Sequence, residues 1–280
     1  MAKKIKPTVN VFSILIAFLL SVFLSILCLL LGTYFGLFNK ALLSDAMNKS
    51  AYYESVNSYT VEEVSDLLIP QGLDSSVLDN VFTLQTTYTE GKALLDANLN
   101  GQGYTVSTDN IQEKLRNNII DYTSKHNLAM NSTISDNITY FSNQVCSIYV
   151  QNLTVPFLSY FAGIRKMLFQ VMIIAIPVLT LLSVGCILLL IKLQNWLHRA
   201  LRMIAYSFSA TALMVSLLPC YLLITRTYTK INISPIYFHK LLTRYIGQSL
   251  MMYIYSSIVM LAIALFVIAA IYQIKKRLMH

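Results

Sequence analysis

VNVFSILIAFLLSVFLSILCLLLGTYFGLF, residues 9–38, contains no charged side chain. The basic segment MAKKIKPT precedes this stretch, and NKALLSDAMNKS follows it. A helix needs about 20 apolar residues to cross the hydrocarbon core of a bilayer, whereas the apolar part of a secretion signal has about 7–15. Because the stretch is long and no Ala-x-Ala cleavage pattern follows it, we interpret it as an uncleaved signal anchor and first transmembrane helix.

Three later stretches also lack Asp, Glu, Lys and Arg, at 167–191, 203–225 and 246–274. The chain of 280 residues is 56% hydrophobic and 12% charged, which is about half the charged share of a soluble domain. A segment in lipid must satisfy its backbone hydrogen bonds within itself, which favours a helix in each stretch. The sequence therefore predicts an all-α membrane protein with four transmembrane helices.

The charges are unevenly distributed along the chain. All 13 acidic residues lie between Asp45 and Asp136, inside the hydrophilic segment 39–164. That segment also holds six basic residues, so its formal charge is −7, while the rest of the chain has 15 basic residues and no acidic one. Because these basic residues flank the predicted spans and form no single patch, the pattern argues against nucleic-acid binding.

The lysines before the first span favour a cytoplasmic N-terminus, because cytoplasmic flanks carry an excess of Lys and Arg. Three lysines precede this span and only Lys40 follows it closely, although the count over all flanks is nearly even. We therefore expect a bacterial plasma-membrane protein with both termini in the cytoplasm. The predicted segments are, in order, a cytoplasmic tail (1–8), transmembrane helix 1 (9–38), an extracytoplasmic helical domain (39–164), transmembrane helix 2 (167–191), a cytoplasmic loop (192–202), transmembrane helix 3 (203–225), an outer loop (226–245), transmembrane helix 4 (246–274) and a cytoplasmic tail (275–280).

The segment 39–164 is long enough to bury its own core and shows helical periodicity. Thr60 and Glu63 have the spacing of a capping box at a helix start, and Pro70 and Gly72 are expected to end that helix. Residues 108–128 read as an amphipathic helix. Its apolar stripe consists of Ile111, Leu115, Ile119 and Tyr122. We expect four or five helices here, with a short hairpin at 104–106 as an alternative for that stretch.

The sequence lacks the residue spacings that are typical of catalytic and metal sites. It has no H-E-x-x-H, no G-x-S-x-G and no glycine-rich phosphate loop, and none of its four histidines has a partner at metal spacing. Glu62, Glu63 and Asp66 are interpreted as a solvated helix face. The spans contain no Asp, Glu, Lys, Arg or His, which argues against a charge-coupled transporter. We expect no enzyme activity, no cofactor and no metal.

Cysteines and sequons give little further information. Cys146 is the only cysteine of the segment 39–164, which excludes a disulfide within it. A buried thiol is the favoured interpretation, and a bridge between two copies of the chain is the alternative. Five N-x-S/T sequons fall on the predicted outer side, and the abundance of Asn, Ser and Thr explains them without glycosylation. They begin at Asn48, Asn131, Asn137, Asn152 and Asn232.

Two groups of residues are candidate sites. Small residues that favour close helix packing form a G-x-x-x-G motif in span one and a small-residue face in span three. This set comprises Gly32, Gly36, Ser207 and Ala210. Packing within the chain is favoured for them, and docking to a second copy or to a partner's span is the alternative. Six cations form a candidate outer basic collar, facing the acidic domain, anionic lipid or wall polymer, with simple interfacial anchoring as the favoured alternative. They are Arg165, Lys166, Arg226, Lys230, Lys240 and Arg244.

The stretches YYESVNSYTVEEVSDLLIPQGLDSSVLDNVF (52–82) and LLDANLNGQGYTVSTDNIQEKLRNNIIDY (94–122) carry a resemblance. With the order of the spans, they resemble uncharacterised four-span membrane proteins of Gram-positive bacteria that have a helical extracytoplasmic domain between spans one and two. The resemblance implies a fold and brings no activity or site residue. The spans are also similar to cell-division permease-like subunits that pair with an ATPase, but those have a longer cytoplasmic segment than KLQNWLHRALR (192–202).

Two classes of function remain. The first is a non-enzymatic surface receptor, adaptor or assembly factor, whose partners are the lipid bilayer and a membrane or envelope protein, or a second copy of the chain. The second is a transport component, either a pore or an ATPase-linked subunit in which Trp196, Leu197 and Leu201 contact the ATPase. A membrane enzyme acting on lipid, a third class, lacks any candidate catalytic pair.

Overall fold

The computed structural model describes residues 7–126, 132–194 and 196–277. Lys3, Lys4, Lys6, Asn131 and His280 lie outside these residues. The protein is all-helical, with 87% helix and no strand among the described residues. Its chain divides into two compact units, which we name the span unit and the polar unit. The span unit takes the ranges Met1–Leu43, Arg165–Ile233 and Leu242–His280, and the polar unit takes Ser44–Ile164 and Ser234–Leu241.

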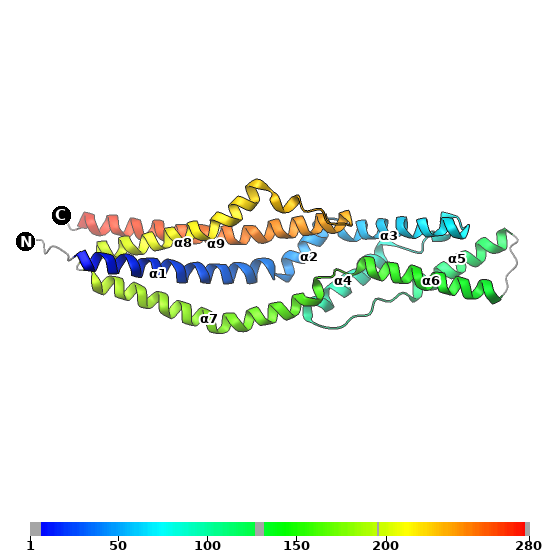
Figure 1. Ribbon diagram of the computed structural model, residues 1–280, viewed down its shortest axis with the longest axis horizontal. Coiled ribbons are helices and arrows are strands. Elements are labelled where there is room, and N and C mark those ends of the chain that lie inside the picture. Colours follow the sequence, from blue (N-terminus) through cyan, green and yellow to red (C-terminus); the bar gives the residue numbers. More distant parts are fainter. Residues whose placement is uncertain (1–6, 127–131, 195, 278–280) are drawn as a thin grey trace, which may run out of the picture. The chain divides into compact units, whose positions relative to one another are not determined.

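Four helices of the described chain are long and apolar enough to cross a membrane, as many as the spans that the sequence predicts (Figure 1). They are α1 (Pro7–Gly32), extended by the π-helix η1 (Thr33–Leu37), then α7 (Leu158–Leu193), α8 (Leu197–Thr225) and α9 (Ile236–Arg277). α7 and α9 begin well before the charge-free stretches, because a helix can continue into water with polar and charged residues. The connections are therefore shorter than the predicted loops 192–202 and 226–245. The latter loop reduces to 226–235, with the 3-10 helix η4 (Thr227–Thr229).

The polar unit contains shorter helices. They are α2 (Lys40–Lys49), whose first residues belong to the span unit, α3 (Tyr52–Leu68), α4 (Leu84–Asn100), α5 (Asp109–Lys125) and α6 (Ser132–Leu153), with the 3-10 helices η2 (Ile69–Gln71) and η3 (Ser75–Leu78). α3 packs against α4 and α6, and α5 packs against α6 and η3. Residues 102–108, where a hairpin was the alternative, are irregular.

The predicted capping box at Thr60 and Glu63 is wrong. α3 begins two turns earlier, at Tyr52, after Ala51 adopts a left-handed conformation with φ of 51°. Thr60 lies buried in the middle of the helix. The Asn152 side-chain amide of α6 donates to Glu63 Oε2 at 2.7 Å and to Thr60 Oγ1 at 3.3 Å. The capping pattern therefore serves a contact between α3 and α6. The predicted end of the helix is confirmed, because Gly72 follows η2 with φ of +68°.

The core of the polar unit is built from stripes at four-residue spacing. Ile111, Leu115 and Ile119 of α5 are buried as predicted, but the next buried position is Thr123, and Tyr122 is half-buried beside it. The fourth position of the stripe differs because the four-residue spacing continues from Ile119 to Thr123, and not to Tyr122. α3 and α6 contribute buried residues to the same core. These are Val56, Val64 and Leu68 from α3, and Phe141, Val145, Tyr149 and Leu153 from α6.

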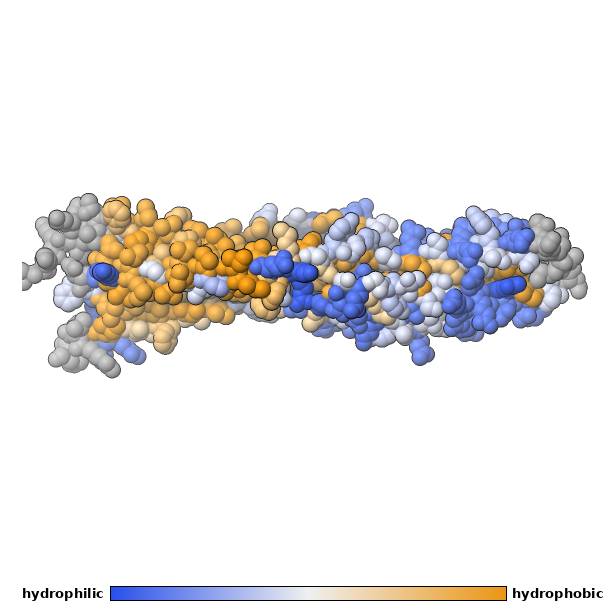
Figure 2. Space-filling model, turned by 90° about the horizontal axis from the view of Figure 1, so that it is seen from below, coloured by the Kyte–Doolittle hydropathy of each residue, from blue (hydrophilic) through white to orange (hydrophobic). Residues whose placement is uncertain are grey.

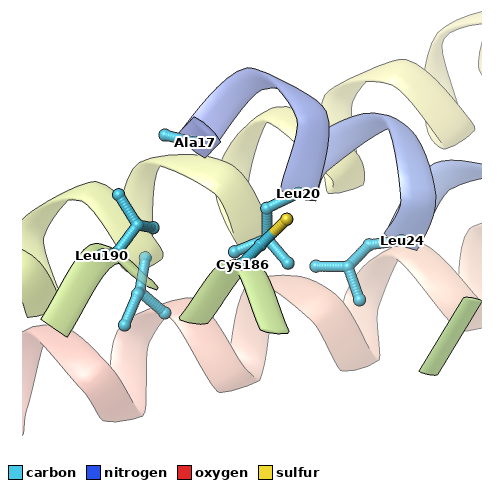
Figure 3. Packing of buried hydrophobic residues seen from close by; sticks show 6 residues of the cluster. Ala17, Leu20, Leu24, Cys186 and Leu190 are labelled. Carbon is cyan, nitrogen blue, oxygen red and sulfur yellow. The ribbon is translucent and has the colours of Figure 1, made fainter. Parts of the chain in front are cut away.

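The span unit buries a narrower core. Ala17, Leu20 and Leu24 of α1 pack with Cys186 and Leu190 of α7, and Ile204 of α8 completes the cluster (Figure 3). Much of the remaining surface of this unit is hydrophobic, as the orange region of Figure 2 shows, whereas hydrophilic residues dominate the surface of the polar unit. A soluble protein rarely exposes apolar area of this extent, so the surface of the span unit suits a surrounding bilayer.

Candidate functional site

Gly32 and Gly36 lie where α1 and η1 approach α9. A Cβ atom on Gly32 would lie 2.5 Å from Tyr253 Cδ1, and one on Gly36 would lie 3.0 Å from the Ser249 carbonyl oxygen. The Tyr253 hydroxyl is hydrogen-bonded to Thr33 Oγ1 at 2.8 Å. This G-x-x-x-G motif therefore packs inside the chain, which is one of the two alternatives that the sequence leaves open.

The small-residue face of α8 contacts the backbone of α1. Ser207 Oγ donates to the Ala17 carbonyl at 2.7 Å, and Thr211 Oγ1 donates to the Ser21 carbonyl at 3.1 Å. Both side chains are buried, while the candidate packing residue Ala210 is half-buried. In lipid, such side-chain hydrogen bonds join helices that share no hydrophobic driving force with each other.

The six cations of the predicted collar are divided between the two units. Lys240 belongs to the polar unit, because α9 begins at Ile236 and its first turns pack there. In the span unit, the Arg165 guanidinium lies 5.1 Å from the Tyr34 ring centroid, and its Nη2 atom donates to the Tyr34 hydroxyl at 3.3 Å. Lys166 is exposed next to it.

The other three span-unit cations of the collar lie in the connection between α8 and α9 and in the turns of α9 that follow. Arg226 and Lys230 flank η4, and Arg244 lies on α9. All three side chains are exposed. The structure thus places three collar residues around one connection and does not bring the six together within one unit.

The polar unit contains a groove that the sequence does not predict. It has a volume of about 680 Å³ and lies between the α2–α3 turn and the start of α4. Its lining residues are Met47, Asn48, Ala51, Tyr52, Tyr53, Glu54, Leu84, Gln85 and Tyr88. We call it the tyrosine groove. α2 ends at Lys49, and the left-handed Ala51 precedes the start of α3.

Three tyrosine rings of the tyrosine groove contact one another edge to face. The Tyr53 ring centroid lies 5.5 Å from that of Tyr52 and 5.1 Å from that of Tyr88. Tyr52 and Tyr53 are buried, and their burial raises the pKa of both phenols above the ordinary value. Tyr88 is 41% exposed. The one charged lining residue, Glu54, is acidic.

A second, acidic pocket of about 450 Å³ lies beside η3 and α5, and its polar lining groups serve the local structure. Asp74 caps η3, and the hydrogen bond from the Ser76 backbone amide lowers the pKa of its carboxyl. The Asn118 side-chain amide donates to the carbonyls of Val77 and Asp79 at 2.8 and 3.0 Å. Among the described residues, no three His, Cys, Asp or Glu side chains are placed to hold a metal ion.

Cys146 is a free thiol buried on α6, as its favoured interpretation predicts. Trp196 and Leu197 are exposed at the start of α8, and Leu201 packs partly against the core of the span unit. No protein-family model, curated protein or solved structure matches the chain. The candidate sites therefore rest on geometry alone, and the geometry of the tyrosine groove suits noncovalent recognition, with aromatic edges beside a carboxylate.

Proposed function

We propose that the protein is a receptor, adaptor or assembly factor whose polar unit binds a segment of a membrane or envelope protein. The tyrosine groove is the observation that carries this proposal. Exposed aromatic residues are enriched at protein interfaces, and a concave site with few polar groups is the usual form of a binding pocket. Under this proposal the polar unit is extracytoplasmic, as the lysines before α1 favour.

The charge of the polar unit indicates the chemistry of the partner. Its 13 acidic and six basic residues give a formal charge of −7. The Lys92 ammonium lies 6.0 Å from the centroid of the Tyr88 ring, at the outer limit of a cation–π contact. A partner segment with Lys or Arg next to apolar side chains would pair with Glu54 and fill the space between Leu84 and Tyr88.

The tyrosine groove is linked to a candidate span through one ring contact. The Tyr52 ring centroid lies 5.6 Å from that of Tyr237, which is buried in the first turn of α9. The Tyr237 hydroxyl also donates to the Asn152 carbonyl at 3.4 Å. Because α9 continues into the span unit at Leu242, a shift of Tyr52 on binding would act directly on this helix. Such a link suits a protein that reports or assembles across a membrane.

Site-specific photo-crosslinking in cells tests the proposed function. A photoreactive amino acid replaces Tyr88 in the groove or, as the control, Tyr140, which is 75% exposed on α6. We expect a defined membrane or envelope protein to be captured from position 88 and not from 140. The variant Glu54→Lys should reduce this capture, because it removes the acidic group of the groove.

Other outcomes would replace the proposal. Equal capture from both positions, or capture that Glu54→Lys leaves unchanged, would rule out the groove as the recognition surface. A stoichiometric ATPase in mild detergent extracts, captured through Trp196 and Leu197, would favour a transport component. A second copy of the chain captured from position 88 would make the groove a contact for self-assembly.

A further inference from the structure

The polar unit has a further groove between α5 and α6, which we call the α5–α6 groove. Its volume is about 570 Å³, and all but one of its lining residues are polar or charged. Its polar lining residues include Asp109, Gln112, Glu113, Arg116, Asn117 and Ser142. The α5–α6 groove shares no residue with the tyrosine groove, so a ligand here would be recognised separately.

Ser142 of α6 is a buried lining residue whose hydroxyl is left unpaired. Its side chain is 1% exposed, and its Oγ atom has no hydrogen-bond partner among the described residues. A hydroxyl in a helix often donates to the carbonyl four residues earlier, as Thr139 does to Ser135 at 3.0 Å. A buried polar group without a partner costs free energy and calls for an explanation in a native structure. A ligand in the groove would supply the missing partner.

Three charged side chains of α5 line the same groove. Asp109, Glu113 and Arg116 are exposed and lie on successive turns of the helix. Glu113 and Arg116 are three residues apart, a spacing at which opposite charges can pair. Within the part of the chain that the structure describes, however, none of the three side chains forms an ion pair. The groove therefore keeps both anionic and cationic groups available to a ligand.

We propose that the α5–α6 groove binds a short peptide with a free ammonium end and a free carboxylate end. Asp109 and Glu113 hold the ammonium group, and the planar donors of Arg116 match the carboxylate oxygens in pairs. Asp109 and Arg116 are separated by about 10 Å along the helix axis, which is the length of about three residues of extended chain. The Ser142 hydroxyl bonds a peptide group between the two ends.

Saturation-transfer NMR on the full chain in mild detergent tests this site with two probes. They are trialanine and its analogue with an acetylated N-terminus and an amidated C-terminus. We expect trialanine to bind at least tenfold more tightly, because a hydrogen bond to a charged group contributes about tenfold in affinity. Arg116→Gln should weaken trialanine binding by about tenfold for the same reason. The matched control Lys125→Gln removes an exposed cation from the last turn of α5 and should leave binding unchanged.

The variant Ser142→Ala separates a ligand contact from a structural role. It should weaken trialanine binding by about fivefold, because a neutral hydrogen bond to the peptide is lost. The melting temperature of the chain should stay the same or rise, since the variant removes a buried hydroxyl that has no partner in the protein.

Hydrogen exchange gives a readout that needs no variant. Trialanine should protect the amides of 109–120 and 139–142 from exchange. Several results would each overturn the proposal: no binding of trialanine at millimolar concentration, equal affinity for the blocked analogue, or protection confined to the tyrosine groove at 84–88. Unchanged binding in Arg116→Gln or Ser142→Ala, or an equal loss in Lys125→Gln, would overturn it as well.

Discussion

Glycines in helices of this protein differ sharply in the space around them. A Cβ atom on Gly32 would lie within 2.6 Å of two atoms of the Tyr253 ring, and Thr33 fixes that ring through its hydroxyl. By contrast, nothing lies within 4 Å of a Cβ atom built on Gly185, in the C-terminal half of α7. The two glycines therefore form a natural pair for testing how closely α1 and α9 approach.

The variant Gly32→Ala should destabilise the span unit by about 1–3 kcal/mol, because the added methyl group displaces the Tyr253 ring from a packed site. Gly185→Ala should leave stability unchanged or raise it slightly. Both variants are compared by thermal unfolding of the full chain in mild detergent. Equal melting temperatures for the two would show that α1 and α9 do not meet at Gly32.

The buried phenols of Tyr52 and Tyr53 should make the polar unit sensitive to alkali. Burial raises the pKa of each above its ordinary value of 10.0, so the folded state favours the neutral phenol. This contribution to stability is complete below pH 10 and is lost as the pH rises from there toward the folded-state pKa. Hydrogen exchange of α3 and α4, corrected for its intrinsic pH dependence, should therefore stay flat from about pH 7 to 9 and accelerate above about pH 10.

The variant Tyr53→Phe keeps the ring and removes one titrating group, so it should weaken that acceleration. Tyr140→Phe is the control, because Tyr140 is exposed and its hydroxyl is not part of the core. An unchanged alkaline response in Tyr53→Phe would mean that the phenol ionises without unfolding its surroundings.

Among the helical elements, α1 and α8 are held together by hydroxyls that reach a neighbouring backbone. Removing both donors with Ser207→Ala and Thr211→Val should cost about 1–2 kcal/mol, since one such bond in a membrane protein contributes about 0.6 kcal/mol on average and up to about 1.7. Ser216→Ala is the control, because the Ser216 hydroxyl bonds only within α8, to the Leu213 carbonyl. Reversible unfolding in mixed micelles measures the difference, and equal losses would contradict the interhelical role.

The elements that local composition determines are the ones that the sequence predicts. Charge-free stretches predicted the four long apolar helices, because a run of apolar residues suits lipid whatever its neighbours are. The start of α3 was not predictable, since the pair Thr60 and Glu63 looks the same in a cap and in a helix interior. The role of this pair depends on its contact with Asn152, which lies far along the chain.

The candidate sites, too, could be predicted only as far as the local sequence determines them. Gly32 and Gly36 indicated a close helix contact, but nothing local named α9 as the partner. The basic collar was predicted from the proximity of its residues to the spans in the sequence. Lys240 belongs to the polar unit because α9 starts before the charge-free stretch. The tyrosine groove was missed because two separate segments, 47–54 and 84–88, build it. Paired tyrosines after a short polar helix were its only local signal.

For the whole molecule, four crossings require that alternate connections lie on the same side of the membrane. Single cysteines at exposed positions test this in a parent with the half-buried Cys220 replaced by Ser, while the other native cysteines are buried. Ile69→Cys reports on the polar unit and Ile231→Cys on the connection between α8 and α9. Trp196→Cys and Lys276→Cys report on the other two positions. All four sites are exposed.

A membrane-impermeant maleimide added to intact cells should label positions 69 and 231, whereas 196 and 276 should react only after the membrane is opened. The reverse pattern would keep the four spans and place the polar unit in the cytoplasm, where a surface partner cannot reach the tyrosine groove. Labelling of only one of positions 69 and 231 in intact cells would contradict the four-span arrangement itself. The helices α7 and α8 lie between these positions, and two crossings return the chain to the same side. In that case one of these two helices does not cross the membrane, despite its length and its apolar surface.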